Sequence, residues 1–227
     1  MNRLLIARMN VDPQYEGEFN EWYNGEHMRQ ASAIQGFGKS HRRYRALSFQ
    51  GDYWTYLPNP EYTAIYDIER DAALLAAINS DQYKAWSGDF LERWRDRTHD
   101  EASIICEQIF GEESPIPYET VLIAQMNVGE GREEEFNSWY NDEHILQANR
   151  IPGFGSDHRR FRAIELRGKY WHYRALPRYT ALYEIHPEAD VLSAINSDEY
   201  REWSGDFLAR WREGTTDEVS TICTRIY

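Results

Sequence analysis

The sequence predicts an α+β fold in which two tandem βαββαβ units pack sheet to sheet as an α/β barrel within one chain. The main observation is a duplication, because residues 4–110 align with residues 121–227 at a constant offset of 117, without a gap. Of the 107 aligned positions, 60 are identical. A period this long, in only two copies, indicates a duplicated domain rather than a solenoid repeat. We therefore expect a first domain at 1–110, a linker at 111–118 and a second domain at 119–227.

The first copy is expected to open with a strand and an amphipathic helix. Leu4–Met9 is a short apolar run typical of a strand. Tyr15–Ile34 has helical periodicity, with aromatic and apolar residues on one broad face at steps of three and four. Gly36 is expected to end this helix, and Pro152 makes the corresponding stop in the second copy firmer.

The rest of the copy is expected to hold two strands, a helical region and a closing strand. His41–Phe49 alternates as a strand does, and Tyr62–Ile68 is a second such run. Asp71–Arg95 is helical, with a break near Ser80, which is expected to cap the second segment. Ala102–Phe110 closes the copy as a strand. This order is that of a ferredoxin-like unit, whose sheet carries both helices on one face. The bare faces of two such sheets can cover each other.

The composition limits the classes of function. The 227 residues include 25 Lys and Arg against 38 Asp and Glu, a formal charge of −13, so no basic field is expected for nucleic acid. No apolar run approaches the roughly 18 residues of a membrane span, and the N-terminus lacks the apolar stretch of a signal peptide. We therefore expect a cytoplasmic protein. Cys106 and Cys223 are not in Cys-x-x-Cys spacing and predict neither a disulfide framework nor a thiolate metal cluster.

Aromatic residues make up 15% of the chain, which is more than packing alone usually requires. The densest cluster runs from Phe19 to His27, with its twin from Phe136 to His144. Tyr23 and His27 are four residues apart, so both project from one helix face. An imidazole beside a phenol can pass protons to and from a bound substrate. The other interpretation is that both side chains simply belong to the buried stripe of the helix, and the sequence leaves the two about equal.

A second polar cluster lies in the strand that follows this helix. His41 and Arg43 point to one face of the strand and Arg42 to the other. An arginine on the pocket face would bind a carboxylate or phenolate of a substrate. The alternative is that one face meets solvent or pairs with the abundant acids. The sequence does not decide which face lines a pocket.

Two motifs of each copy are shared with a known family. The first motif is Trp22-Tyr23-Asn24-Gly25-Glu26-His27 followed by Gly36-Phe37, and in the second copy it is Trp139-Tyr140-Asn141-Asp142-Glu143-His144 followed by Pro152-Gly153-Phe154. The second motif is Asn79-Ser80-Asp81 with Tyr83 and Trp86, and in the second copy it is Asn196-Ser197-Asp198 with Tyr200 and Trp203. With these motifs the chain resembles the EthD-like branch of the dimeric α/β-barrel superfamily. The first copy departs from the pattern at Gln35, where the turn would carry proline.

The resemblance implies a pocket between the first helix and the sheet of each unit. It makes His27 and His144 the acid–base candidates, while Tyr23 and Tyr140 would orient or protonate a substrate oxygen. We expect the substrate-binding residues to be Trp22, Trp139, Asn24, Asn141, His41, His158, Arg43, Arg160, Tyr66, Tyr183, Trp86 and Trp203. The layout is also similar to that of bacterial chalcone isomerase, which uses a histidine on its first helix.

The main prediction is a cofactor-independent isomerase or lyase, cyclisation and hydration or dehydration included, acting on a small aromatic or polyketide-like compound. Two alternatives stay open: a monooxygenase or haem-dependent enzyme on the same fold, and a non-catalytic protein that binds aromatic metabolites. We expect no metal or nucleotide cofactor, because the spacings typical of such sites are absent from the sequence. No nucleic-acid or membrane partner is expected. A chain that completes its own barrel need not dimerise, and further pairing of two chains stays open.

Overall fold

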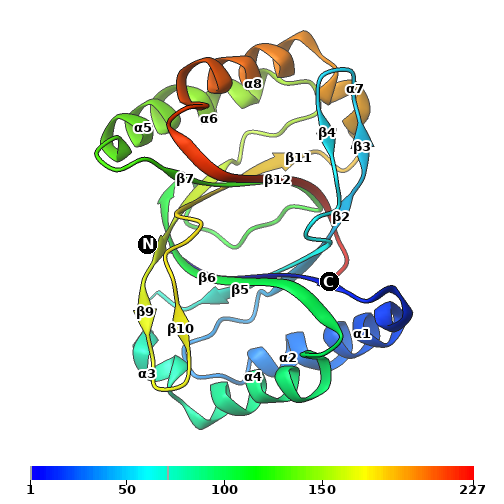
Figure 1. Ribbon diagram of the computed structural model, residues 1–227, viewed down its shortest axis with the longest axis vertical. Coiled ribbons are helices and arrows are strands. Elements are labelled where there is room, and N and C mark those ends of the chain that lie inside the picture. The colour runs from blue at the N-terminus through cyan, green and yellow to red at the C-terminus, as the bar shows by residue number, and fades with distance from the viewer. Residues whose placement is uncertain (1, 71) are drawn as a thin grey trace.

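The computed structural model describes residues 2–70 and 72–227, which form two similar halves joined in one closed barrel (Figure 1). The elements of the first half are β1 (Arg3–Val11), a 3-10 turn (Pro13–Tyr15), α1 (Glu16–Trp22), a π-helical segment (Tyr23–His27), α2 (Met28–Ala31), β2 (Arg42–Leu47), β3 (Phe49–Gln50), β4 (Thr55–Tyr56), β5 (Tyr62–Ile68), α3 (Leu74–Ile78), α4 (Asp81–Trp94) and β6 (Thr98–Phe110). Those of the second half are β7 (Thr120–Val128), α5 (Glu133–Trp139), a π-helical segment (Tyr140–His144), α6 (Ile145–Gln147), a 3-10 turn (Ala148–Arg150), β8 (Arg159–Ile164), β9 (Leu166–Arg167), β10 (His172–Tyr173), β11 (Tyr179–Ile185), α7 (Val191–Ile195), α8 (Asp198–Trp211) and β12 (Thr215–Arg225).

The sheet topology confirms the predicted ferredoxin-like order and the intramolecular barrel. The strands of the first half run β6-β1-β5-β2, and those of the second run β12-β7-β11-β8. All neighbouring pairs are antiparallel. The two sheets also bond to each other, β2 to β12 and β6 to β8. Each half thereby covers the edge strands of the other, and the eight strands close without an exposed edge.

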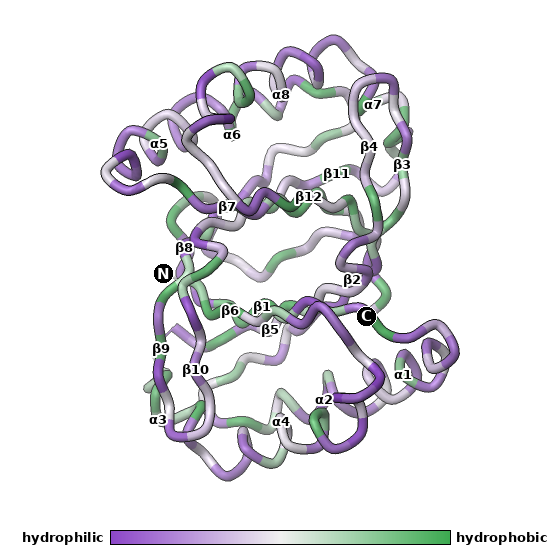
Figure 2. Tube along the Cα trace, viewed as in Figure 1, coloured by the Kyte–Doolittle hydropathy of each residue, from purple (hydrophilic) through white to green (hydrophobic). Residues whose placement is uncertain are grey.

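The side chains divide into three apolar layers, as the alternation along the strands dictates. On β1, Leu4 and Ile6 point into the barrel, while Leu5 and Ala7 face the helices. One core therefore fills the barrel between the two sheets, and one further core lies under the helices of each half. Figure 2 shows the apolar strands at the centre of the molecule and the more polar helices outside them.

The first helix differs from the expected regular helix in one respect. At Tyr23–His27 the helix widens to a π turn, in which the Met28 N–H bonds to the Tyr23 carbonyl five residues earlier. The same happens at Tyr140–His144. The helix then ends before Gly36, whose φ of +91° favours glycine. A Cβ on Gly36 would also approach the Ala72 Cβ to 2.9 Å, so the predicted stop has two physical causes.

The second helical region is broken where the sequence predicts the break. Ser80 precedes α4, and its hydroxyl accepts a hydrogen bond from the Tyr83 N–H, while Ser197 does the same for Tyr200 before α8. The region begins at Leu74 with α3, and the predicted starting residue, Asp71, lies outside the described residues.

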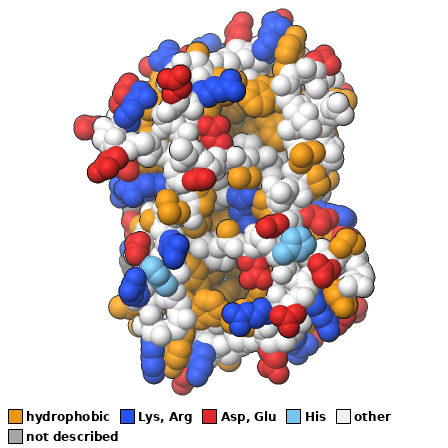
Figure 3. All heavy atoms as spheres, viewed as in Figure 1, with side chains coloured by type: hydrophobic (Ala, Val, Ile, Leu, Met, Phe, Trp, Pro, Cys, Tyr) orange, Lys and Arg blue, Asp and Glu red, His pale blue; other side chains and the backbone are white. Residues whose placement is uncertain are grey.

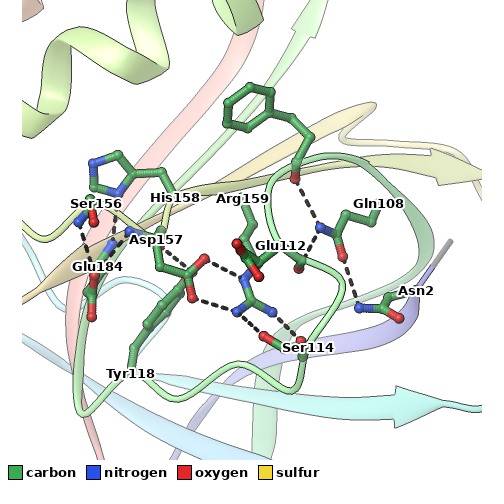
Figure 4. Close-up of polar contacts among 11 residues, drawn as sticks. Asn2, Gln108, Glu112, Ser114, Tyr118, Ser156, Asp157, His158, Arg159 and Glu184 are labelled. Atoms are coloured by element: carbon green, nitrogen blue, oxygen red, sulfur yellow. Dashed lines mark hydrogen bonds and ion pairs between the residues drawn. The ribbon is translucent and has the colours of Figure 1, made fainter.

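The segment between the halves is more firmly held than its turn-like composition suggests. Ile116 and Tyr118 are buried at the end of the barrel where β6 leads into β7. Arg159 binds the Asp157 carboxylate at 2.6 Å and also contacts Ser114, as Figure 4 shows. The Tyr118 hydroxyl donates to the Asp157 carbonyl at 2.5 Å. The connector therefore plugs this end of the barrel.

Within residues 2–70 and 72–227, no helix has both the length and the apolar character that a membrane span requires.

Candidate functional site

Each half contains a cavity between its sheet and its helices. The first-half cavity measures about 90 Å³ and the second-half cavity about 80 Å³. The space-filling view is hollowed in both halves, and hydrophobic side chains form the floor of each hollow (Figure 3). A cavity of about 150 Å³ accepts a whole benzene molecule. These two therefore admit the edge of a planar ring rather than a whole polycyclic compound.

Both cavities are completed by the opposite half of the chain. The β9–β10 hairpin supplies Trp171 and Tyr173 to the cavity of the first half, and the β3–β4 hairpin supplies Trp54 and Tyr56 to that of the second. Tyrosine pairs fix both hairpins, since the Tyr173 hydroxyl bonds to that of Tyr83 and the Tyr56 hydroxyl to that of Tyr200. Neither cavity would be closed in a single separated copy.

His27 lies at the wall of the first cavity, between two indoles. Its ring stacks on Trp86 at 4.6 Å and 13°, and Trp22 covers its other face at 4.7 Å. The Trp86 indole N–H donates to the His27 main-chain carbonyl at 3.0 Å, which fixes the stack. The His27 Nδ1 atom is buried without a partner among the described residues, which leaves Nε2 as the ring nitrogen open to the cavity.

The π turn explains how Tyr23 reaches the same cavity. With more residues per turn than an α-helix, it brings side chains four apart almost into line, and the Tyr23 and His27 rings meet at 4.7 Å. The second half repeats the arrangement with Tyr140 and His144 at 4.7 Å and with Trp203 stacked at 4.7 Å and 10°. Single π turns inside α-helices are frequent at functional sites.

Burial keeps the cavity histidines neutral. It lowers the pKa of His27 to about 3, and the positive charge of Arg43 acts in the same direction. It also lowers the pKa of His144 to about 3, with Arg160 and Arg210 contributing. At neutral pH each ring is therefore an uncharged imidazole, which can accept a proton from a group that enters the cavity.

The Tyr23 phenol is part of a buried polar chain behind the cavity. Its hydroxyl and that of Tyr66 are 2.7 Å apart, and burial raises the pKa of both groups. Arg43 lies over the Tyr23 ring at 4.4 Å and donates to the Asn24 Oδ1 atom at 2.9 Å. Within the described part of the chain, no carboxylate forms an ion pair with Arg43. Its charge therefore acts on Tyr23 and, through it, on the cavity.

The structure places six of the predicted site residues at the cavities: His27, His144, Tyr23, Tyr140, Trp86 and Trp203. It also decides the face of the second strand, because Arg43 and His41 lie on the helix side of the sheet while Tyr44 points into the barrel.

The other predicted substrate-binding residues do not line either histidine cavity: Trp22, Trp139, Asn24, Asn141, His41, His158, Arg43, Arg160, Tyr66 and Tyr183. They form a layer behind it, because the first helix and the sheet already pack tightly there. Tyr66 is fully buried against Trp86, and burial lowers the pKa of His41 to about 4. His158 accepts a hydrogen bond from the Glu184 N–H at 3.2 Å (Figure 4). These residues therefore pack behind the residues that line the cavities.

Sequence reasoning did not assign the hairpin residues Trp54, Tyr56, Trp171 and Tyr173 to a site. The two Tyr-Trp-x-Tyr segments were recognisable as repeated aromatic motifs, but nothing local indicates that each reaches the other copy. Phe90 and Phe207, Met9 and Met126, and the polar pairs Glu101–Ser103 and Glu218–Ser220 also line the cavities.

The cavities do not fit haem. A porphyrin is several times larger than the benzene molecule that fills about 150 Å³, whereas each cavity measures about 80 to 90 Å³. Both faces of His27 are already covered by indoles. Among the described residues, no group of three or more His, Cys, Asp or Glu side chains is arranged to hold a metal ion.

Comparisons with known proteins give a likeness of fold only. No family model matches the sequence, and no curated protein matches it. Among solved structures, an anthrone oxidase-like protein has a TM-score of 0.64 at 11% identity and covers 100% of this chain and 92% of its own. A candidate monooxygenase from Lactobacillus acidophilus NCFM has a TM-score of 0.52 at 12% identity, covering 99% and 93%. A candidate chlorite dismutase has a TM-score of 0.55 at 11% identity, covering 100% and 96%.

These structures match the chain over its whole length and share its architecture. Identities this low carry over the fold and not the chemistry. The chain has the fold of the dimeric α/β-barrel superfamily, with both barrel halves supplied by one duplicated polypeptide.

Proposed function

We propose that the chain is a cofactor-independent enzyme that removes a proton from a hydroxylated aromatic compound and lets the resulting anion react with dioxygen. The observation that carries the proposal is the neutral imidazole of His27, and of its twin His144, held between indoles with Nε2 open to an aromatic cavity. The names of the structural neighbours, a candidate monooxygenase and an anthrone oxidase-like protein, favour oxygen as the acceptor.

The substrate is expected to enter edge first. The aromatic walls bind its ring faces, and the small cavity brings only the reacting edge to His27. His27 Nε2 takes a proton from a hydroxyl of the substrate ring or from a ring carbon that this hydroxyl makes acidic. Burial disfavours the charged imidazolium, so the developing negative charge of the substrate must stabilise it. Proton transfer by a positioned group typically contributes about 10²–10⁴-fold in rate.

The negative charge left on the substrate is expected to be stabilised by the Tyr23 hydroxyl and by Arg43, which lies behind the Tyr23 ring. The Tyr23 hydroxyl can donate to a substrate oxygen while it keeps contact with Tyr66. Arg43, buried against the Tyr23 ring, adds a positive charge in a site of low dielectric, where such a charge acts strongly. Arg43 does not touch the cavity, so its role is that of a positioning residue.

The reaction balances with dioxygen as the only co-reactant. A ring carbon that carries two hydrogens loses both, one as the proton taken by histidine, and gains one oxygen atom as a carbonyl. The second oxygen atom leaves as water. Two electron pairs pass from the substrate to oxygen, so the substrate itself is the reductant.

An isomerase or lyase is the second candidate, and the Tyr23–Tyr66 pair favours it. A phenol that can return a proton to another atom of the same substrate would complete an isomerisation without oxygen. This candidate has the same first step at His27. The Trp-Tyr-Asn-x-Glu-His motif supports assignment to the EthD-like branch, which we propose on that motif alone.

Oxygen uptake separates the two candidates. Purified protein is incubated with anthrone and with 1,8-dihydroxyanthrone, each of which has a ring carbon that carries two hydrogens, in an oxygen electrode, and the products are identified by mass spectrometry. We expect one O₂ consumed per ketone formed. Product formation without oxygen uptake would support the isomerase or lyase. Tight binding of both probes with no product would contradict both enzymes and leave a binding protein.

The hairpins provide an internal control for the location of the site. In a His144→Phe background only the first cavity is active, and Trp171→Ala is expected to lower kcat/KM roughly 10- to 100-fold, because the substrate loses an aromatic wall. Trp54→Ala in the same background should leave kcat/KM within about twofold, because Trp54 lines the other cavity. Equal effects of the two substitutions would contradict the assignment of hairpins to cavities.

A further inference from the structure

A third cavity lies at the barrel end opposite the connector, and Arg8 is the one lining residue that it shares with a histidine cavity. It measures about 310 Å³ and is bordered by matching residues of both halves, among them Asp100 and Asp217, Pro60 and Pro177, Ala102 and Val219. These residues are related by the offset of the duplication, so the cavity lies where the two halves meet. Arg8 borders it from the first half.

Arg8 breaks the symmetry of the barrel interior. It lies on β1 between Ala7 and Met9, which face the helices, so its side chain points into the barrel. The corresponding residue of β7 is Gln125, whose amide donates to the Thr180 hydroxyl at 3.0 Å. The two halves therefore differ at this position of the barrel interior: Arg8 is a cation in the first half and Gln125 is neutral in the second.

Arg8 is 93% buried, at 7% relative exposure, and yet it has no hydrogen-bond or ion-pair partner among the described residues. Its Nε atom makes no hydrogen bond, and no ion pair joins Arg8 to any residue within the described ranges 2–70 and 72–227. The other buried arginines differ in this respect: Arg42 contacts Asp67, Arg159 contacts Asp157, and Arg43 contacts Asn24. An unpaired buried guanidinium is costly, so a missing counter-ion is the natural explanation.

Other polar groups of the same layer also lack partners. Thr63 is directly opposite Arg8 in the β1–β5 register, and its buried hydroxyl makes no hydrogen bond within the part of the chain that the structure describes. The Gln125 Oε1 atom is buried and unpaired as well. A hydroxyl donor beside a guanidinium is a suitable arrangement for two oxygens of a carboxylate.

The rim of this cavity has the opposite charge. Asp100 and Asp217 border it, and their carboxylates accept hydrogen bonds from Asn10 at 3.0 Å and Asn127 at 2.8 Å. A bare anion would be repelled at the rim, whereas a molecule with an inner carboxylate and an outer ammonium group would suit both charges.

We propose that this barrel mouth binds a small carboxylate, with Arg8 and Thr63 holding the carboxylate and the Asp100–Asp217 rim favouring a ligand with an ammonium group at its other end. Arg8 borders both this cavity and the first histidine cavity, and it is the one lining residue that the two share. The carboxylate proposal does not rest on the function proposed for the histidines.

The test uses the full chain and two probes, β-alanine and acetate, measured by isothermal titration and by the shift in Tm. We expect β-alanine to bind more tightly than acetate, and a ligand at a hundred times its Kd to raise Tm by about 5–10 °C. Arg8→Gln copies the residue of the second half, so it is expected to fold, and it should weaken β-alanine binding at least tenfold. Arg29→Gln, at an exposed arginine of α2, is the matched control and should bind as the unaltered chain does.

A second pair of substitutions tests the rim. Asp100→Asn with Asp217→Asn should reverse the preference, so that acetate binds at least as tightly as β-alanine. The proposal is overturned if neither probe binds the unaltered chain, if Arg8→Gln binds β-alanine equally well, or if chloride at the same concentration gives the same Tm shift as acetate.

Discussion

Replacing both cavity histidines by phenylalanine is expected to lower kcat by about 10²–10⁴-fold, the usual contribution of a positioned proton acceptor. The substitutions His27→Phe and His144→Phe retain a planar ring between the indoles, so the aromatic stack is kept while the acceptor nitrogen is lost. Each single variant should keep about half of kcat, because the other cavity remains complete. Steady-state turnover of the three variants measures this directly.

His99→Phe is the matched control for activity, since this histidine lies at the surface with its side chain 52% exposed. It should turn over at the rate of the unaltered chain. Circular dichroism and thermal unfolding establish that the variants are folded. A folded double variant with undiminished kcat would rule out proton transfer by these histidines.

Acid is expected to destabilise the fold progressively below about pH 6.5, because unfolding frees four buried histidines to bind protons. Burial lowers the pKa of His27 and His144 to about 3 and of His41 and His158 to about 4, against about 6.5 in an unfolded chain. Between those values the unfolded state binds more protons, so the stability is present above about pH 6.5 and is lost as the pH falls toward 4. Each histidine contributes up to about 1.4 kcal/mol per pH unit.

Together the four histidines can remove about 5 kcal/mol per pH unit, which is a large part of a typical unfolding free energy of about 5–15 kcal/mol. Urea unfolding at pH 7.5, 6.5, 5.5 and 4.5 gives the slope of the unfolding free energy against pH. In the His27→Phe/His144→Phe variant the slope contributed by histidine should fall by about half. A double variant with the slope of the unaltered chain would mean that these two rings are not held neutral by the fold.

Much of the fold could be predicted because the duplication repeats the pattern twice. Alternation in Tyr62–Ile68, the helix stop at Gly36 and the cap at Ser80 are local signals, and the structure confirms each. The aromatic face of the first helix, with Tyr23 and His27, was likewise visible in the spacing alone. These features could be predicted because each depends on residues that are close together in the sequence.

The rest depends on contacts that are distant in sequence. The π turn moves Tyr23 toward His27, yet no residue in Tyr-Asn-Gly-Glu-His requires it. Trp171 reaches the first cavity only because the barrel closes β6 against β8. The charge of Arg43 predicts a substrate ligand, but packing of the helix places Tyr23 between Arg43 and the cavity. The pairing of the two halves, and which side chain lies nearest to the cavity, are determined only when the barrel is assembled.

Removal of a proton from an aromatic substrate by the cavity histidines can be measured in the absence of oxygen. Anthrone labelled with deuterium at its acidic carbon is incubated anaerobically with the protein, and loss of the label to water is followed by NMR. This readout reports proton abstraction whichever reaction follows. We expect exchange to be about 10²–10⁴ times faster with the unaltered chain than with His27→Phe/His144→Phe. Equal exchange rates for the two proteins would contradict proton removal by these histidines.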